Sequence, residues 1–180
     1  MSQLVGLVNA THRAKSNGHI GLFTTQDLAL LLGKEVNQSF SKFLHKAVKK
    51  NILEKVCKNI FVNPTSPPSG KGILFQVAKI LRWDEFLYVS LESQLSYLGI
   101  ISQIVIDRLT IMTTGRSYTT KTKYGTIEFT HTSRSLESIK DGVYFDAELS
   151  GFRANAERAI GDLKRVGRNV AMINEDNDAE

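Results

Sequence analysis

The sequence predicts an α+β protein built from two domains. Three observations support this prediction: apolar residues at helical spacing in the first 50 positions, a Pro- and Gly-rich break after residue 62, and alternating segments rich in Thr, Ile and aromatic residues after residue 108. A hydrophobic share of 42% over 180 residues is enough to give each domain a modest core. We expect a helical first domain that ends in a hairpin, and a small α/β C-terminal domain whose helices pack on a mostly antiparallel sheet.

The break between the domains is the segment NPTSPPSGKG at residues 63–72. It contains all three prolines of the chain and no large apolar residue, a composition that is typical of a linker. We therefore assign residues 1–63 to the first domain, 64–72 to the linker and 73–172 to the second domain. The acidic run NEDNDAE lies in a tail, residues 173–180.

Two helices open the first domain. The apolar residues of the first helix lie at positions 4–8, and Asn17 begins the turn that ends it. The second helix lies in the segment GLFTTQDLALLLG, where Thr24 or Thr25 is the expected N-cap and Gly33 the expected stop. Its predicted inward-facing residues are Leu28, Leu31 and Leu32.

A third helix begins near Gln38 and ends at Asn51, and it has two distinct faces. One face is apolar and carries Phe40, Phe43, Leu44, Ala47 and Val48. The other face is polar and basic and carries Ser39, Ser41, Lys42, His45, Lys46, Lys49 and Lys50. Two short strands at 52–56 and 60–62 then predict a hairpin.

The order of two helices, a basic helix and a hairpin is the layout of a winged helix-turn-helix, in which the basic helix enters the major groove of DNA. The charge distribution agrees with this interpretation. Residues 1–63 hold nine Lys or Arg against three acids, a net charge of +6, whereas residues 64–180 hold fourteen against fifteen, a net charge of −1. Nucleic acid is therefore the leading candidate partner of the first domain.

The residue types on the basic helix suit contact with DNA. Lysines bind phosphates, and short serine side chains let the helix approach the base edges. Because Arg, Asn and Gln are absent from the middle of the helix, we expect DNA shape to carry part of the specificity. Two alternatives to DNA contact stay open: the lysines could form an ordinary solvated face, and His45 could be an ordinary surface histidine. The predicted DNA contacts are Thr25, Gln38, Ser39, Ser41, Lys42, His45, Lys46, Lys49, Lys50, Lys58 and Asn59.

The second domain begins with an amphipathic helix at 73–81. A second helix starts near Ser90 and stops at Gly99, with Leu91, Leu95 and Leu98 facing inward. Strands are expected in RLTIMTT, SYTTKTK and TIEFTHT, and a last helix begins after the N-cap Asn155. The basic residues that this domain would offer to DNA or to a protein partner are Arg116, Lys121 and Lys123.

Several segments resemble a known family when they are taken in order. YVSLESQLSYLGII, RLTIMTTGRS, KYGTIEFTHT and FRANAERAIGDL in the second domain resemble AbiEi, the antitoxin and transcriptional regulator of type IV toxin–antitoxin systems. In the first domain, LFTTQDLALLLG through ILEKVCKNIFVNP resembles that family's winged-helix domain. The resemblance covers residues 20–170.

The resemblance implies a protein that binds operator DNA in its own promoter and represses a two-gene operon. The second gene of such an operon encodes AbiEii, a nucleotidyltransferase-like toxin, which the antitoxin counteracts as part of phage defence. Family members use the second domain for neutralisation and in part for repression, and they often bind paired repeats cooperatively. Cooperative or dimeric binding on DNA is thus an expectation here. This chain is shorter than many members, which carry a longer C-terminal portion.

Two other functions stay open. The winged helix could serve protein interaction alone, without sequence-specific DNA binding. The enzyme alternative is a metal-dependent nuclease, whose carboxylates would be Asp146 and Glu148 together with Glu128. Against it, the residue two positions after Glu148 is Ser150 instead of the expected lysine. His131 lies among Thr130, Thr132 and Ser133, and no Gly-x-Ser-x-Gly turn is present, so a nucleophilic triad has no better support.

The remaining motifs point away from catalysis and from a membrane. The run Gly115-Arg116-Ser117 is more simply a hairpin turn than a phosphate loop, and no P-loop is present. A single cysteine, Cys57, excludes an internal disulfide, and the four histidines lack zinc-site spacing. We expect no enzymatic activity, no catalytic residue, no metal and no cofactor. Without a signal segment or an apolar span, a cytoplasmic protein with no membrane partner is expected.

Overall fold

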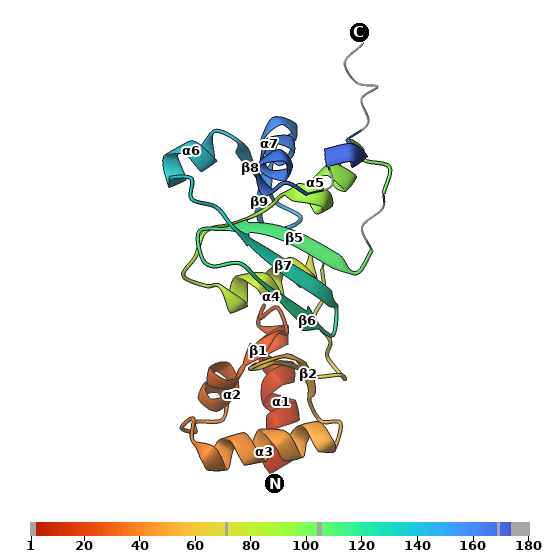
Figure 1. The fold of residues 1–180 in the computed structure, drawn as a ribbon. Helices are drawn as coiled ribbons and strands as arrows, with labels where there is room; N and C mark the ends of the chain where they lie inside the picture. Colours follow the sequence, from red (N-terminus) through yellow and green to blue (C-terminus); the bar gives the residue numbers. More distant parts are fainter. Residues whose placement is uncertain (1–2, 71, 104–105, 169, 174–180) are drawn as a thin grey trace. The chain divides into compact units, whose positions relative to one another are not determined.

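The computed structural model describes residues 3–70, 72–103, 106–168 and 170–173 (Figure 1). The chain divides into two compact units, unit 1 at Met1–Ile73 and unit 2 at Leu74–Glu180. Over the described residues the fold is mixed α+β, with seven α-helices, one three-stranded sheet and one six-stranded sheet. Apart from Ile173, the predicted acidic tail at 173–180 lies outside the described residues.

Unit 1 contains the predicted helices and hairpin. Its elements are α1 (Gln3–Ser16), β1 (Phe23–Thr24), α2 (Thr25–Leu31), α3 (Gln38–Lys49), β2 (Glu54–Cys57) and β3 (Ile60–Val62). The strand order is β1-β3-β2, and both pairs are antiparallel. The register shifts between Lys55 and Cys57, which leaves Val56 as an extra residue in β2. The sheet therefore consists of the hairpin plus the two-residue strand that precedes α2.

The start of α2 is defined by a capping box. Thr24 Oγ1 accepts a hydrogen bond from Asp27 N at 3.1 Å, and Asp27 Oδ2 accepts one from Thr24 N at 2.7 Å. These two bonds satisfy backbone donors that a helix N-terminus otherwise leaves unpaired. Gly33, with a φ of 60°, follows the helix in the left-handed conformation that glycine adopts without strain. Both predicted ends of this helix are confirmed.

Two leucines that were predicted to face inward are exposed instead. Leu31 and Leu98 are each 38% exposed. Both lie at the C-terminal ends of short helices, since α2 ends at Leu31 and α5 (Leu91–Tyr97) ends one residue before Leu98. The core of unit 1 is formed by Leu7, Phe23, Leu28, Ala29, Phe40, Leu44, Ala47, Leu53 and Phe61.

The first half of the predicted linker is packed onto α1. Asn63 is buried, and its Nδ2 donates to Thr11 Oγ1 at 2.8 Å. Asn63 Oδ1 accepts from the backbone N of Thr65 at 2.9 Å, and Lys15 Nζ donates to the carbonyl of Pro67. Residues 64–68 therefore belong to unit 1. The bonds to Thr11 and Thr65 also give the buried Asn63 amide the partners that it needs.

Unit 2 is built around the six-stranded sheet. Its elements are α4 (Ile73–Leu81), β4 (Leu87–Val89), α5, β5 (Arg108–Thr113), β6 (Tyr118–Thr122), β7 (Gly125–His131), α6 (Leu136–Lys140), β8 (Val143–Asp146), β9 (Gly151–Ala154), α7 (Ala156–Val166) and a 3-10 turn, η1 (Val170–Met172). The strand order is β6-β7-β5-β4-β9-β8. The pairs β5–β7 and β4–β9 are parallel and the other pairs are antiparallel. The sheet is mixed: three of its five strand pairs are antiparallel, in line with the expected mostly antiparallel sheet, and the two parallel pairs were not predicted.

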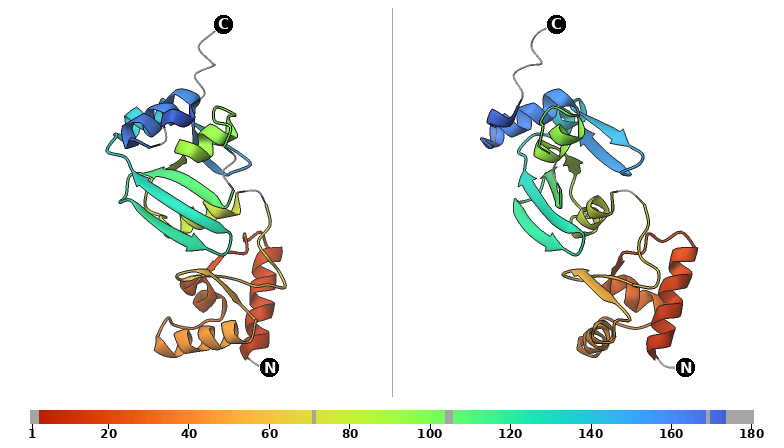
Figure 2. Two further views of the ribbon diagram at one scale, coloured as in Figure 1. Left: turned by 45° about the vertical axis from the view of Figure 1, so that its right-hand side comes forward. Right: turned by 90° about the vertical axis from the view of Figure 1, so that its right-hand side faces the viewer.

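Helices cover both faces of this sheet (Figures 1 and 2). On one face, α5 and α7 lie side by side, and the core there includes Tyr88, Leu95, Met112 and Leu163. On the other face lies α4, whose Phe75 occupies the space above Gly151, so that a Cβ at residue 151 would be 2.1 Å from the Phe75 ring. A side chain at position 151 would therefore displace α4.

A buried carboxylate connects the sheet with α7. Asp162 is fully buried, and its Oδ2 accepts hydrogen bonds from Tyr88 Oη and Ser90 Oγ, both at 2.9 Å. Arg134 Nη2 lies 3.5 Å from Asp162 Oδ1. Burial, together with the charge of Asp162, raises the pKa of Tyr88 well above its ordinary value. The cluster holds α7 on β4 through polar contacts within an apolar core.

Replacing Tyr88 tests this cluster. Tyr88→Phe keeps the ring but removes one hydrogen bond to a buried charge, so we expect the free energy of unfolding of unit 2 to fall by about 2 kcal/mol. Amide hydrogen exchange of β4 in the full chain measures the loss. Tyr118→Phe is the matched control, because Tyr118 stacks on Phe129 through its ring. Equal protection in both variants would contradict a stabilising role for the Tyr88 hydroxyl.

Candidate nucleic-acid interface

Both ends of α3 are set by asparagines. Asn37 is the N-cap, and its Oδ1 accepts from the backbone N of Phe40 at 2.9 Å. At the other end Asn51 has a φ of 55°, and the backbone N of Ile52 donates to the carbonyl of Ala47 at 2.9 Å. A left-handed residue after the last turn is a common way for a helix to end. The stop predicted at Asn51 is confirmed.

The two faces of α3 separate cleanly. Phe40, Leu44 and Ala47 are buried in the core of unit 1. The opposite side, which we call the α3 polar face, is exposed to solvent and consists of Gln38, Ser39, Ser41, Lys42, His45, Lys46 and Lys49. Within the described ranges no carboxylate forms an ion pair with Lys42, Lys46 or Lys49. The three ammonium groups are thus available to an external anion.

The short side chains of Ser39 and Ser41 leave little bulk on the first turns of the α3 polar face. Ser41 Oγ donates to the carbonyl of Asn37 at 3.1 Å, so its hydroxyl hydrogen is used within the helix while its oxygen can still accept. Ser39 lies beside a shallow cavity that Lys34 and Asn37 also line. Lys34 Nζ lies 5.2 Å from the centre of the Phe43 ring, a cation–π distance that places one more cation beside this helix.

A second group of predicted contacts lies at the hairpin turn. Lys58 and Asn59 are exposed, and Asn59 adopts the left-handed conformation, with a φ of 61°. The carbonyl of Asn59 accepts from the backbone N of Thr25 at 3.3 Å. The structure thereby places Thr25, which is half-buried, beside the turn. Lys50 is exposed at the C-cap of α3.

Cys57 lies beside this turn and is buried. Burial raises the pKa of its thiol, and the lowering effect of the Lys55 charge is smaller. The thiol donates a weak hydrogen bond to the carbonyl of Lys58, with the sulfur 3.9 Å from the oxygen. A protonated, buried thiol is a poor nucleophile, so Cys57 acts here as a packing residue.

The three basic residues predicted in unit 2 follow one edge of its sheet. Arg116 precedes β6, Lys121 lies on β6 and Lys123 lies in the turn to β7, and all three are exposed. Strand β6 is an edge strand. The backbone of Arg116 is held in place because its carbonyl accepts from Arg82 Nη2 at 2.7 Å. These residues form a separate basic edge on unit 2.

The carboxylates of the nuclease alternative do not meet. Glu128 lies on β7 and Asp146 on β8, with β5, β4 and β9 between those two strands. Glu128 pairs with Arg108 at 2.8 Å, and Asp146 Oδ2 accepts from Arg153 Nε at 2.5 Å. Among the described residues no group of three His, Cys, Asp or Glu side chains could hold a metal ion. The metal site that this alternative requires is therefore not formed by these residues.

The turn at Gly115 is unsuited to a phosphate. The carboxylate of Glu85 lies directly against Gly115, where a Cβ would be 1.9 Å from Glu85 Oε2. The carboxylate thus occupies the space beside the glycine backbone that a bound phosphate would need. His131 is exposed, and its Nδ1 lies 2.8 Å from the carbonyl of Gly115. The turn and the histidine are thus explained by contacts within unit 2.

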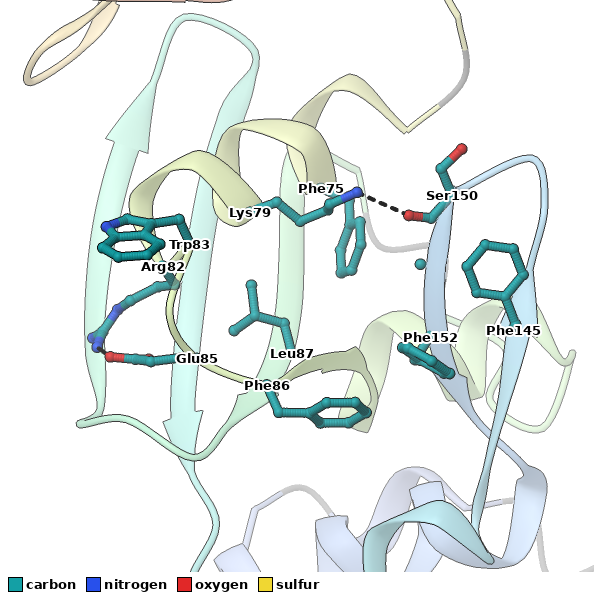
Figure 3. A pocket seen from close by; sticks show the side chains of 11 residues that line it. Phe75, Lys79, Arg82, Trp83, Glu85, Phe86, Leu87, Phe145, Ser150 and Phe152 are labelled. Atoms are coloured by element: carbon teal, nitrogen blue, oxygen red, sulfur yellow. Dashed lines mark hydrogen bonds and ion pairs between the residues drawn. The ribbon is translucent and has the colours of Figure 1, made fainter. Parts of the chain in front are cut away.

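One feature that sequence reasoning missed is a cavity in unit 2 lined by aromatic side chains (Figure 3). Trp83, the only tryptophan of the chain, is 84% exposed beside it. The sequence offered one signal, an isolated Trp83 in the polar run RWDEF. Phe75 and Phe86 lie near Trp83 in the sequence, but Phe145 and Phe152 come from a distant segment, so only the fold brings all these rings together.

Comparison with known proteins adds no further assignment. No protein-family model matches the chain, and no curated protein matches it either. Over the described ranges no helix combines the length and the apolar character needed to cross a membrane. The functional argument therefore rests on the residues and their geometry.

The pairing of Asp146 with Arg153 predicts a pH dependence. The hydrogen bond from Arg153 is the main cause that lowers the pKa of Asp146 below its ordinary value. The ionised carboxylate therefore stabilises the fold above the ordinary carboxyl pKa of about 4, and this contribution is lost as the pH falls through the lowered value. Asp146→Asn should show a smaller loss of stability on acidification than the unaltered chain.

Urea denaturation at a series of pH values from neutral to strongly acidic measures this difference. Asp84→Asn is the control, since Asp84 is exposed on the α4–β4 loop. The same acid dependence in the Asp146 variant and in the unaltered chain would show that the pair contributes nothing to stability.

Proposed function

We propose that unit 1 is a winged-helix DNA-binding domain and that the protein is an autorepressor and antitoxin. The element order α1-β1-α2-α3-β2-β3, with β1 paired to the hairpin, is compatible with a winged helix-turn-helix. The single observation that carries the proposal is the α3 polar face. It combines unpaired lysines, short serines and a buried opposite side on one helix.

The chemistry of that face suits the major groove. An α-helix about 10–12 Å in diameter fits a groove about 12 Å wide. Lys42, Lys46 and Lys49 lie on the exposed side of α3, where each can reach a phosphate. The groups that face base edges in this arrangement are Gln38, Ser41 and His45. Because they include no arginine, DNA shape supplies part of the sequence preference.

The turn between β2 and β3 supplies a second set of backbone contacts. Lys58 and Asn59 are exposed there, next to the N-terminus of α2 at Thr25. Lys58 supplies the positive charge of this group, and the exposed Asn59 side chain can donate to a phosphate oxygen. We assign this group to phosphates that flank the groove occupied by α3.

The antitoxin part of the proposal rests on the resemblance to AbiEi. By that resemblance the operator lies in the protein's own promoter, and the protein counteracts a nucleotidyltransferase-like toxin. Unit 2 is then the neutralising domain, with Arg116, Lys121 and Lys123 as its candidate contacts to DNA or toxin. Their support is exposure along one sheet edge.

A protein-interaction module is the second candidate function. The observation that favours it is a pair of exposed aliphatic side chains. Leu30, near the end of α2, is 82% exposed, and Val36, in the turn before α3, is 50% exposed. Exposed aliphatic side chains suit a protein partner better than a phosphate backbone. The two functions differ in one property, since only DNA binding depends on Lys42, Lys46 and Lys49.

The deciding experiment measures binding to the DNA upstream of this protein's gene over a series of salt concentrations. An unrelated duplex of equal length serves as competitor. Tight, competitor-resistant binding with a steep salt dependence supports a sequence-specific autorepressor. If alanine at Lys42, Lys46 and Lys49 leaves the affinity unchanged, DNA binding by α3 is refuted and the protein-interaction function is favoured.

Lys46→Ala is the sharpest single variant for the phosphate contacts. It should weaken binding to all duplexes and reduce the slope of log affinity against log salt by about one. Fluorescence anisotropy with labelled duplexes measures both quantities. Lys140→Ala is the matched control, because Lys140 is exposed on α6 in unit 2. A slope that stays the same would remove Lys46 from the interface.

Ser41→Arg tests which residues face the bases. A long, bidentate donor at this position should change the preferred sequence, with a discrimination of about 1–3 kcal/mol at one base pair. Binding selection from a randomised operator measures the preference. Lys55→Arg, on β2 of the hairpin, is the control, since it should leave the preference as it is. An unaltered preference in the Ser41 variant would place the base-reading surface elsewhere.

A further inference from the structure

Unit 2 contains a cavity of about 460 Å³ beside α4 (Figure 3). Aromatic side chains supply much of its lining: Phe75 from α4, Trp83 and Phe86 from the α4–β4 loop, Phe145 from β8 and Phe152 from β9. The volume is within the range of about 300–1,000 Å³ that is usual for small-molecule sites. A cavity of this volume is too small to hold an α-helix of a partner protein, which is about 10–12 Å in diameter.

Two of the aromatic rings present free surface on opposite sides of the cavity. Trp83 is 84% exposed and Phe145 is 61% exposed, and Figure 3 shows them at its two ends. Phe152 packs beside Phe145 and Phe86, with its ring centre 5.6 Å from that of Phe145 and 5.1 Å from that of Phe86. Exposed rings beside an aromatic floor form a stacking platform for a planar group.

One cation is directed at this platform. Lys79 Nζ lies over the cavity and donates to the carbonyl of Ser150 at 3.0 Å, which uses one of its three donors. The other charged groups in the lining satisfy each other, since Arg82 pairs with Glu85. Glu85 Oε2 also accepts from Thr113 Oγ1 at 2.7 Å. The charge that the cavity offers to a ligand is therefore positive and comes from Lys79.

The cavity walls are joined to each other. Gln76 Nε2 donates to the carbonyl of Leu149 at 2.7 Å, and the Lys79 bond to Ser150 lies one helical turn further along α4. These two bonds connect α4 with the β8–β9 turn. Phe75, packed above Gly151, fills the space between them. A site whose walls are already connected loses little conformational freedom when a ligand binds.

We propose that this cavity binds a nucleotide, with the base stacked among the aromatic rings and the phosphate bound by Lys79. An apolar ligand would leave the Lys79 ammonium unused, and an inorganic anion would leave the rings unused. A nucleotide satisfies both, because every base has a π face and every nucleotide carries a phosphate. The site is separate from the α3 polar face and is independent of DNA binding by unit 1.

A free nucleotide and the terminal nucleotide of a nucleic-acid single strand would offer the same chemical groups to this cavity. Both present one base and one phosphate to the platform. Adenosine 5′-monophosphate is the probe for the first source, and a short single-stranded oligonucleotide with a terminal phosphate is the probe for the second. Tighter binding of the oligonucleotide would identify a strand end as the ligand, and equal or weaker binding would identify a free nucleotide.

Trp83 allows a direct measurement in the full-length protein. As the only tryptophan of the chain, it reports on this cavity alone through its intrinsic fluorescence. Adenosine 5′-monophosphate should quench that fluorescence in a saturable manner. Adenosine should quench it with about tenfold lower affinity, as expected when one charge-assisted hydrogen bond is lost. Inorganic phosphate should leave the emission unchanged.

Two variants separate stacking from charge. Phe145→Ala should lower the affinity for both nucleotide and nucleoside by about tenfold, the effect of losing one stacking partner. Lys79→Ala should lower the affinity for the nucleotide alone by about tenfold. The matched controls are Tyr97→Ala, an aromatic residue of the same 61% exposure outside the cavity, and Lys140→Ala. Circular dichroism confirms that each variant is folded.

Absence of saturable quenching by either probe would overturn the proposal and leave the aromatic cavity to a protein partner. Quenching that is equal in the Phe145 and Tyr97 variants would also overturn it. Duplex binding by anisotropy is measured in parallel on the same variants. Because duplex binding depends on α3, failure of the nucleotide site leaves the proposed function intact, and the reverse also holds.

Discussion

The packing of α3 against the core of unit 1 is the interaction on which its proposed interface depends. Phe40, Leu44 and Ala47 bury one side of the helix. Since side chains three and four positions apart share a face, burying this side turns the lysines outward. The asparagine at each end, Asn37 and Asn51, sets the length of the helix. Apolar packing and polar capping thus place the lysines of α3 together on one exposed face.

Unit 2 combines apolar packing with buried charge in a different manner. Its core holds Asp162 among apolar residues; Oδ2 accepts from Tyr88 and Ser90, and Arg134 lies 3.5 Å from Oδ1. At the C-terminal end of α7, Arg168 pairs with both Glu92 and Glu128 and so connects α5 with β7. These polar connections hold the helices on one face of the sheet and leave the cavity beside α4 on the other.

Much of unit 1 could be predicted because its signals are local. The Thr24 cap, the Asn51 stop and the 3.6-residue spacing of α3 all lie within a few residues of the features they determine. Strands β4, β8 and β9, each three or four residues long, were not predicted, whereas the equally short β2 and β3 were, because a short connection between them indicates a hairpin. The mixed sheet and the aromatic cavity were missed because parallel pairing and ring clustering depend on contacts far apart in sequence, which leave no periodic trace.

The position of β4 within the sheet determines how much of the chain must be synthesised before unit 2 can fold. Strand β4 lies between β5 and β9, and Tyr88 on β4 needs Asp162 on α7 as its partner. Nearly eighty residues must therefore leave the ribosome after β4 before unit 2 can close. Unit 1, in contrast, is complete once Pro67 has docked on α1 and Pro68 has packed against Gly21. The basic unit 1 can thus fold during synthesis, whereas unit 2 needs its last helix before it can fold.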